Sequence, residues 1–266
     1  MGRSIYKKLN IFVAGLVMFS SLQAQQKNPG EKTITPYNHS RYKLWYNEPA
    51  KNWNEALPLG NGFIGGMVFG NIQNERIQLN ESTIWGGGPN NTIDSAARPY
   101  IEKVRALLAE KKYNEAQELA NSKLGPKGNS GLPYHLAGNL YIKFAGTDSV
   151  SDYYRDLNIA NATAVVKYTS KGVNYKREYF TAFGDNVLMA RLTANKPVMI
   201  NCKIKLQSPL KSSASVNGKE TLVLSGQGSD HEGQKGQIKY TVLTRAKTSH
   251  GTCITDTTGI TIAKAN

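Results

Sequence analysis

The sequence predicts a mainly β protein: a large antiparallel β-sandwich (a super-sandwich) with a small helical hairpin inserted into it. Of its 266 residues, 39% are hydrophobic and 20% are charged, which is typical of a folded globular chain. From Gly138 onward, apolar and polar residues alternate with the period of a strand, and short polar turns separate these runs. Helical spacing of apolar residues is confined to the stretch between Asp94 and Gly125.

The first residues, Met1–Ala24, have the pattern of a secretory signal peptide. Basic residues precede the apolar run Leu9–Phe19, and small residues follow it up to Ala24. The apolar run is too short for a membrane-spanning helix. We therefore expect an exported protein, periplasmic or extracellular, in which residues 25–41 form a polar lead-in and residues 42–266 form the β-sandwich domain.

The formal net charge of +14 is smaller once the signal peptide is set aside. The signal peptide contains three of the 33 basic residues, so 30 basic residues remain against 19 acidic ones. A nucleic-acid partner would explain such a surplus, but the lysines are spread singly along predicted strands and no nucleic-acid module is recognisable. We expect a solvated basic surface and no nucleic-acid partner. Two cysteines and four scattered histidines predict neither a metal site nor a cofactor.

Residues 44–81 predict short strands joined by tight glycine turns, because brief apolar runs alternate there with glycines. Two helices follow, and the second ends at Gly125-Pro126. Apolar residues at helical spacing mark the first helix, and we expect this stripe to pack against the β scaffold: Ile101, Val104, Leu107 and Leu108.

The second half of the chain predicts a series of antiparallel strands. Ala164–Tyr168 and Val173–Tyr175 flank Ser170-Lys171-Gly172, which is a hairpin pattern. Cys202 lies in phase with apolar neighbours, so we expect its side chain to be buried; a disulfide with Cys253 is the alternative. The remaining predicted strands are Leu140–Phe144, Val187–Leu192, Val198–Leu206, Thr221–Leu224, Ile238–Thr244 and Gly259–Ile262.

All three tryptophans fall within residues 44–89, together with asparagines and glutamates. Flat apolar rings suit the faces of sugars, and amides and carboxylates suit their hydroxyl groups. The plainer interpretation is that the tryptophans belong to the core and the glycines to turns. The candidate residues for binding substrate or another domain are Trp45, Trp53, Asn61, Asn80, Glu81 and Trp85.

The same stretch resembles the opening of glycoside hydrolase family 95, the inverting α-L-fucosidases and their α-L-galactosidase relatives. The residues that carry the resemblance are LWYNEPAKNWNEALPLGNGFIGGMVFGNIQNERIQLNESTIWGGGP. Weaker similarity continues through Glu102–Leu124, Gly138–Ile142, Tyr154–Leu157 and Tyr175–Phe180. The resemblance implies the N-terminal β-sandwich domain of such an enzyme, with a fucosylated glycan as the substrate of the complete enzyme.

The resemblance also implies that the catalytic residues belong to an (α/α)6 barrel that follows this domain in the family. Inverting hydrolysis needs an acid on one side of the bond and a water activator on the other. In the family both lie in the barrel, so we expect no catalytic residue here and an inactive chain when it is alone. Glu81, beside Asn80 and Trp85, is a weak alternative candidate for a catalytic residue. The sequence stops within strand-like alternation, and we expect a truncated, incomplete sandwich.

Three functions remain open from the sequence. The first is a part of an exported fucosidase-like hydrolase whose partner is the barrel. The second is a free-standing carbohydrate-binding module that uses Trp45, Trp53 or Trp85 as its platform. The third is a purely structural domain that supports a neighbouring barrel.

Overall fold

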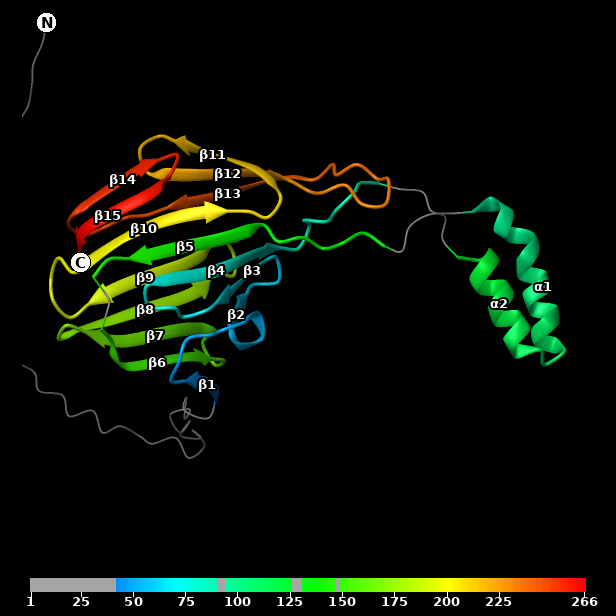
Figure 1. The fold of residues 1–266 in the computed structure, drawn as a ribbon, viewed down its shortest axis with the longest axis horizontal. Helices are drawn as coiled ribbons and strands as arrows, with labels where there is room; N and C mark the ends of the chain where they lie inside the picture. The colour runs from blue at the N-terminus through cyan, green and yellow to red at the C-terminus, as the bar shows by residue number, and fades with distance from the viewer. Residues whose placement is uncertain (1–41, 90–93, 126–130, 147–148) are drawn as a thin grey trace, which may run out of the picture. The chain divides into compact units, whose positions relative to one another are not determined.

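A computed structural model describes residues 42–89, 94–125, 131–146 and 149–266. The signal peptide and lead-in expected in residues 1–41 lie outside the described residues. The described strands form three sheets, and all their pairings are antiparallel (Figure 1). This architecture confirms the predicted β-sandwich with a helical hairpin.

A seven-stranded sheet forms the first layer. Its strands, in spatial order, are β14 (Thr252–Asp256), β15 (Gly259–Ala265), β10 (Ile200–Gln207), β5 (Gly138–Phe144), β4 (Asn74–Glu81), β3 (Ile64–Val68) and β2 (Leu57–Gly60). Two smaller sheets form the second layer. The five-stranded sheet contains β1 (Lys43–Tyr46), β6 (Ser151–Asn158), β7 (Thr163–Ser170), β8 (Val173–Thr181) and β9 (Leu188–Ala194). The three-stranded sheet contains β11 (Lys211–Asn217), β12 (Thr221–Gln227) and β13 (Lys239–Arg245).

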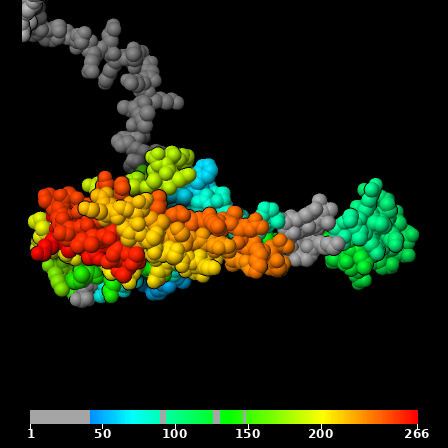
Figure 2. Space-filling view, turned by 90° about the horizontal axis from the view of Figure 1, so that it is seen from above, coloured from blue at the N-terminus to red at the C-terminus, as the bar shows by residue number. Residues whose placement is uncertain are grey.

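The core lies between these layers, and all three sheets contribute to one buried cluster. Ile77 and Ile142 from the large sheet, Val166 from the five-stranded sheet and Leu224 from the three-stranded sheet are among its members. Within β10, Cys202 is buried in phase with Ile200, Ile204 and Leu206, as the alternation predicted. Residues 200–266, yellow to red in the space-filling view, run together over the side of the sandwich seen from above (Figure 2).

The hairpin predicted around Ser170-Lys171-Gly172 is present as β7 and β8. Ser170 pairs with Val173, and the two turn residues, Lys171 and Gly172, both have positive φ, at 50° and 70°. A two-residue turn of this kind follows the right-handed twist of its strands. Strands β6, β11 and β14 were missed by the alternation, because β6 buries charged residues and the other two form sheet edges with mostly exposed side chains.

The helical hairpin consists of α1 (Arg98–Ala109) and α2 (Tyr113–Lys123), which pack on each other; the 3-10 turn Ser95–Ala97 precedes α1. The expected burial of its apolar stripe against the β scaffold is wrong. Ile101 and Leu108 remain exposed, and Ala116 is the buried residue of α2. Helical periodicity identifies an apolar face but not what covers it, so the sequence could not decide this point.

Both cysteines are free thiols. Cys202 on β10 and Cys253 on β14 each pair with Ile262, from opposite sides of β15. A whole strand therefore separates the two thiols, which excludes the alternative of a Cys202–Cys253 disulfide in this structure. None of the described helices is long and apolar enough to cross a membrane.

Candidate functional site

Three loops meet where Trp85 leaves the large sheet, and we call them the triple loop: residues 82–89, 131–137 and 228–238. Backbone hydrogen bonds join all three. They run from Gly86 N to Pro133 O (2.8 Å), from Gly87 N to Ser229 O (2.9 Å), from His135 N to Ile84 O (2.9 Å) and from Gln237 N to Gly87 O (2.9 Å). The region is therefore held by the chain's own backbone.

The glycines of the triple loop allow this close approach. A Cβ at Gly86 would lie 2.7 Å from the ring nitrogen Nε2 of His135 and 2.8 Å from Pro133. At Gly88 it would lie 2.7 Å from the side chain of Gln237. Real Cβ atoms essentially never show such distances, so a side chain at Gly86 or Gly88 would force His135, Pro133 or Gln237 to move.

Trp85 and Tyr134 form an aromatic pair on this support. Their ring centroids are 5.1 Å apart with planes tilted by 53°. The indole Nε1 of Trp85 donates to the backbone carbonyl oxygen of Ser82 at 3.1 Å. The hydroxyl of Tyr134 donates to the backbone carbonyl oxygen of Glu81 at 2.8 Å. Both side chains are nonetheless more than 40% exposed. Hydrogen bonds thus fix both rings while part of their apolar surface stays open to solvent.

The carboxylate of Glu81 is occupied by its own turn. It accepts from the backbone nitrogen of Thr83 at 2.9 Å and from the Thr83 hydroxyl at 2.6 Å. A turn-capping role explains this geometry. Next to it, the buried Oδ1 of Asn80 has no hydrogen-bond partner among the residues that the structure describes.

Asn61 joins the turn between β2 and β3 to the loop between β8 and β9. Its Oδ1 accepts from the backbone nitrogens of Phe63 (3.0 Å) and Ile64 (2.9 Å). Its Nδ2 donates to the carbonyl oxygen of Ala182 at 2.8 Å and to Oδ1 of Asn186 at 3.1 Å. Every part of this buried amide is used, so Asn61 positions the two loops and is not available to a ligand.

Four exposed aromatic residues stand on this hydrogen-bonded framework, and we call them the aromatic end: Phe63 (60% exposed), Trp85 (44%), Tyr134 (43%) and Phe183 (89%). The carbonyl oxygen of Phe63 accepts from the backbone nitrogen of Ser82 at 2.9 Å, which links the β2–β3 turn to the triple loop. Sequence reasoning found only Trp85 among the four. The others lie in turns, where no periodicity marks an aromatic residue as exposed.

The structure places the remaining two tryptophans elsewhere. Trp45 lies on β1 of the five-stranded sheet, where it stacks on Tyr154. Trp53 lies in the 3-10 turn Trp53–Glu55. Of the six candidates, Asn61, Asn80, Glu81 and Trp85 therefore come together near one end of the large sheet, and Trp45 and Trp53 do not join them.

The most deeply buried carboxylate is Glu75 on β4. It lies 3.4 Å from the guanidinium of Arg177 and accepts a hydrogen bond from the hydroxyl of Tyr179 at 3.0 Å. Burial raises the pKa of Glu75, and the charge of Arg177 offsets part of that effect. Because this group lies inside the core, its role is structural. Among the described residues, no group of three His, Cys, Asp or Glu side chains could hold a metal ion.

This chain is similar to a known domain family and to proteins named as fucosidases. The profile of the glycosyl hydrolase family 65 N-terminal domain matches residues 44–266. Alpha-L-fucosidase 2 of Arabidopsis thaliana is 31% identical over 185 residues, which are 68% of this chain and 22% of that protein. A probable alpha-fucosidase A of Aspergillus niger is 29% identical over 159 residues, 57% of this chain and 20% of that protein.

The chain spans about a fifth of the length of these relatives. The family profile begins within β1 and continues through β15, so it covers the β-sandwich of the described fold. The protein therefore belongs to the family of glycosyl hydrolase family 65 N-terminal domains.

Proposed function

We propose that this domain is the N-terminal part of an exported α-L-fucosidase of the inverting family 95 type, and that it supports the catalytic barrel of that enzyme. The names of the relatives and the family 95 resemblance of residues 44–89 support the substrate. The signal-peptide pattern of Met1–Ala24 supports export. The complete enzyme would release terminal α-L-fucosyl residues from glycans.

The aromatic end carries the proposal for how the domain works. Partly exposed rings that are fixed by hydrogen bonds make good interface anchors, because binding costs them little conformational entropy. The barrel would cover the open surface of Trp85 and Tyr134. The acid and the water activator would come from the barrel, since the carboxylates of Glu75 and Glu81 are already used within this domain.

Replacement of Trp85 by alanine in an enzyme that contains this domain tests the supporting role. We expect a lower melting temperature and looser docking, because an anchoring tryptophan is worth about 2 kcal/mol or more. The Michaelis constant for an aryl α-L-fucoside should change little. Trp53→Ala is the matched control, since Trp53 is also exposed but lies outside the aromatic end. A raised Michaelis constant at an unchanged melting temperature would contradict the supporting role.

Activity measurements test the remaining parts of the proposal. The chain alone should not hydrolyse aryl α-L-fucosides above a buffer blank, and turnover that disappears in Glu81→Gln would overturn this expectation. The coding sequence beyond the codon for Asn266 should encode several hundred helix-rich residues. In the enzyme that contains them, proton NMR should show that the fucose first released has the opposite anomeric configuration to the substrate.

A further inference from the structure

The outer face of the five-stranded sheet carries a second aromatic pair. Trp45 on β1 is 63% exposed, and its ring is nearly parallel to that of Tyr154 on β6, with planes 17° apart and centroids 6.5 Å apart. Trp45 pairs with Asp156 in the register of β1 and β6, and Tyr154 lies two residues before Asp156. All three side chains therefore point to the same face of the sheet, away from the core.

Asp156 holds Tyr154, the inner member of this pair, in place. Its side chain is 4% exposed and lies 3.6 Å from the ammonium of Lys43. Burial, together with a hydrogen bond between the Tyr154 hydroxyl and Asp156, raises the pKa of Tyr154 to about 12. A buried carboxylate that holds the tyrosine and the lysine leaves the tryptophan ring supported but open on its outer side.

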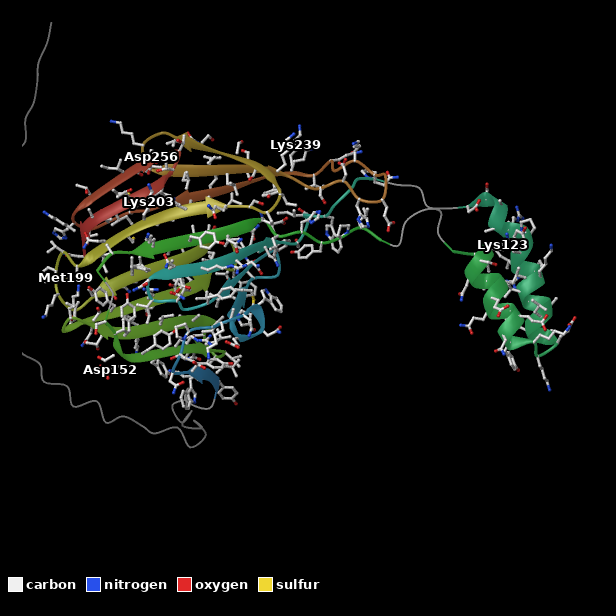
Figure 3. All side chains as sticks on the ribbon, in the orientation of Figure 1. Lys123, Asp152, Met199, Lys203, Lys239 and Asp256 are labelled. Carbon is white, nitrogen blue, oxygen red and sulfur yellow. The ribbon has the colours of Figure 1, made fainter. Side chains whose placement is uncertain are left out.

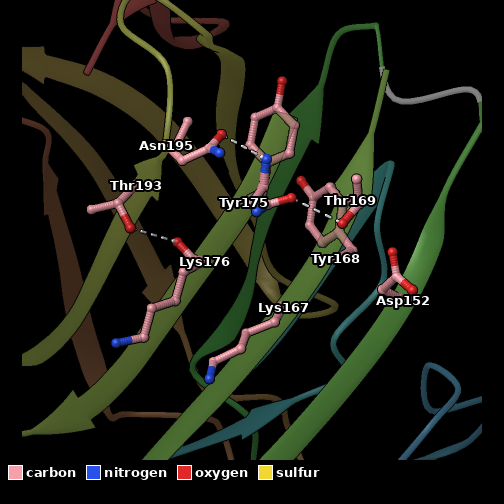
Figure 4. A pocket seen from close by; sticks show the side chains of 10 residues that line it. Asp152, Lys167, Tyr168, Thr169, Tyr175, Lys176, Thr193 and Asn195 are labelled. Carbon is pink, nitrogen blue, oxygen red and sulfur yellow. Dashed lines mark hydrogen bonds between the residues drawn. The ribbon is translucent and has the colours of Figure 1, made fainter. Parts of the chain in front are cut away.

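A shallow groove of about 640 Å³ lies across β7, β8 and β9 on the same sheet (Figure 4). The two features adjoin because Tyr154 pairs directly with Lys167, which lines the groove. Asp152, labelled on β6 in Figure 3, closes one side. The other polar lining residues are Thr169, Asn174, Lys176, Thr193 and Asn195.

Hydrogen bonds hold the polar floor of the groove in place. The hydroxyl of Thr169 donates to Oδ1 of Asn174 at 3.1 Å, and Oδ1 of Asn195 accepts from the backbone nitrogen of Asn174 at 2.8 Å. The amide NH2 groups of both asparagines keep donors for a ligand. The groove therefore presents fixed amide and hydroxyl groups, which are the groups that bond to the hydroxyl groups of a sugar.

We propose that this face binds a neutral oligosaccharide, with one sugar ring on Trp45 and the neighbouring sugars in the groove. A flat apolar ring beside amides and hydroxyls is the combination that sugars require. The charges favour a neutral ligand over a polyanion, because they nearly balance: Lys43 is paired with Asp156, Lys176 is paired with Glu178, and the groove is lined by one further cation, Lys167, and one further anion, Asp152. This site is separate from the aromatic end and does not depend on catalysis.

Calorimetric titration of the full chain tests the proposal. The probes are maltohexaose, cellohexaose and 2′-fucosyllactose, with a chondroitin sulfate hexasaccharide as the anionic comparison. We expect at least one neutral probe to bind and Trp45→Ala to weaken it about tenfold, since a stacked ring carries much of the binding free energy. Trp53→Ala, which removes a similarly exposed tryptophan, should leave binding unchanged. Failure of every neutral probe to bind, or tighter binding of the sulfated one, would overturn the proposal.

A fluorescence measurement keeps the test decisive if Trp45→Ala does not fold. The double variant Trp53→Phe/Trp85→Phe retains Trp45 as its one tryptophan. Its emission should shift to shorter wavelength when the neutral probe binds, because the sugar excludes water from the ring. An emission change confined to the variant that retains only Trp85 would place the sugar at the aromatic end and refute the proposal. So would gel filtration in which Trp45→Ala dissociates a dimer, because the face would then be an interface between two copies.

Discussion

The carboxylate of Glu75 and the guanidinium of Arg177 form an ion pair, 3.4 Å apart, between the two layers of the sandwich. Arg177 also donates to the carbonyl oxygens of Asn71 at 2.6 Å and Ile72 at 2.5 Å, in the loop that connects β3 to β4. Glu75 accepts from the backbone nitrogen of Gly70 at 2.8 Å in the same loop. One buried pair thus joins β8 of the five-stranded sheet to a loop of the seven-stranded sheet.

Replacement of Arg177 by methionine should lower the free energy of unfolding by about 3–5 kcal/mol, because it leaves the Glu75 carboxylate buried without its partner. Urea denaturation monitored by tryptophan fluorescence measures this change. Arg191→Met is the matched control: Arg191 lies 4.0 Å from Glu178 on the surface, and its loss should change stability by less than about 0.5 kcal/mol. Equal effects of the two variants would contradict a structural role for the buried pair.

The stability contribution of Glu75 should depend on pH. Burial raises the pKa of Glu75 in the folded state above its ordinary value of 4.5. The folded state therefore binds this proton more readily than the unfolded state does, so stability rises as the pH falls through the raised pKa, down to about 4.5. Melting curves of the wild type should show this rise in stability as the pH falls, and those of Glu75→Gln should lack it. A wild type that loses stability relative to Glu75→Gln in that pH range would show the opposite sign.

The two thiols should differ in reactivity. Burial raises the pKa of Cys202 to about 11, whereas Cys253 is only partly buried and its pKa is raised less. Since the thiolate is the reactive form, a thiol reagent at pH 8 should modify Cys253 first and Cys202 only after unfolding. Mass spectrometry of timed reactions identifies the modified residue. Fast modification of Cys202 in the folded protein would show that this part of the core opens to solvent.

Asn61→Ala should destabilise the protein by about 1–3 kcal/mol, because it leaves two backbone nitrogens and one carbonyl oxygen without their partner. The amide protons of Phe63 and Ile64 should exchange faster with deuterium. Asn54→Ala serves as the control, since the Asn54 side chain is exposed. Unchanged exchange at Phe63 would indicate that the turn between β2 and β3 is held by other contacts.

The alternation of apolar and polar residues was sufficient for most of the β-sandwich. Strands such as β5 and β10 place every second side chain in the core, so a period of two in the sequence is a direct record of burial. The turn at Lys171 and Gly172 could also be predicted from the sequence, because a two-residue hairpin turn needs residues that accept positive φ. Where the buried side chains were charged, as in β6, the alternation failed because Arg155 and Asp156 read as surface residues.

The sequence by itself thus determined the fold class, the main hairpin and the concentration of aromatic and amide residues in one segment. Only the tertiary structure decided which of those residues meet. In the folded chain, Asn61 and Trp85 lie near Phe63 and Tyr134. Trp45 lies on the other layer, where it stacks on Tyr154. The Glu81 carboxylate accepts hydrogen bonds within its own turn. Local patterns record whether a residue faces the core, whereas the partner of an exposed or charged side chain depends on strand register and loop crossings between segments far apart in the chain.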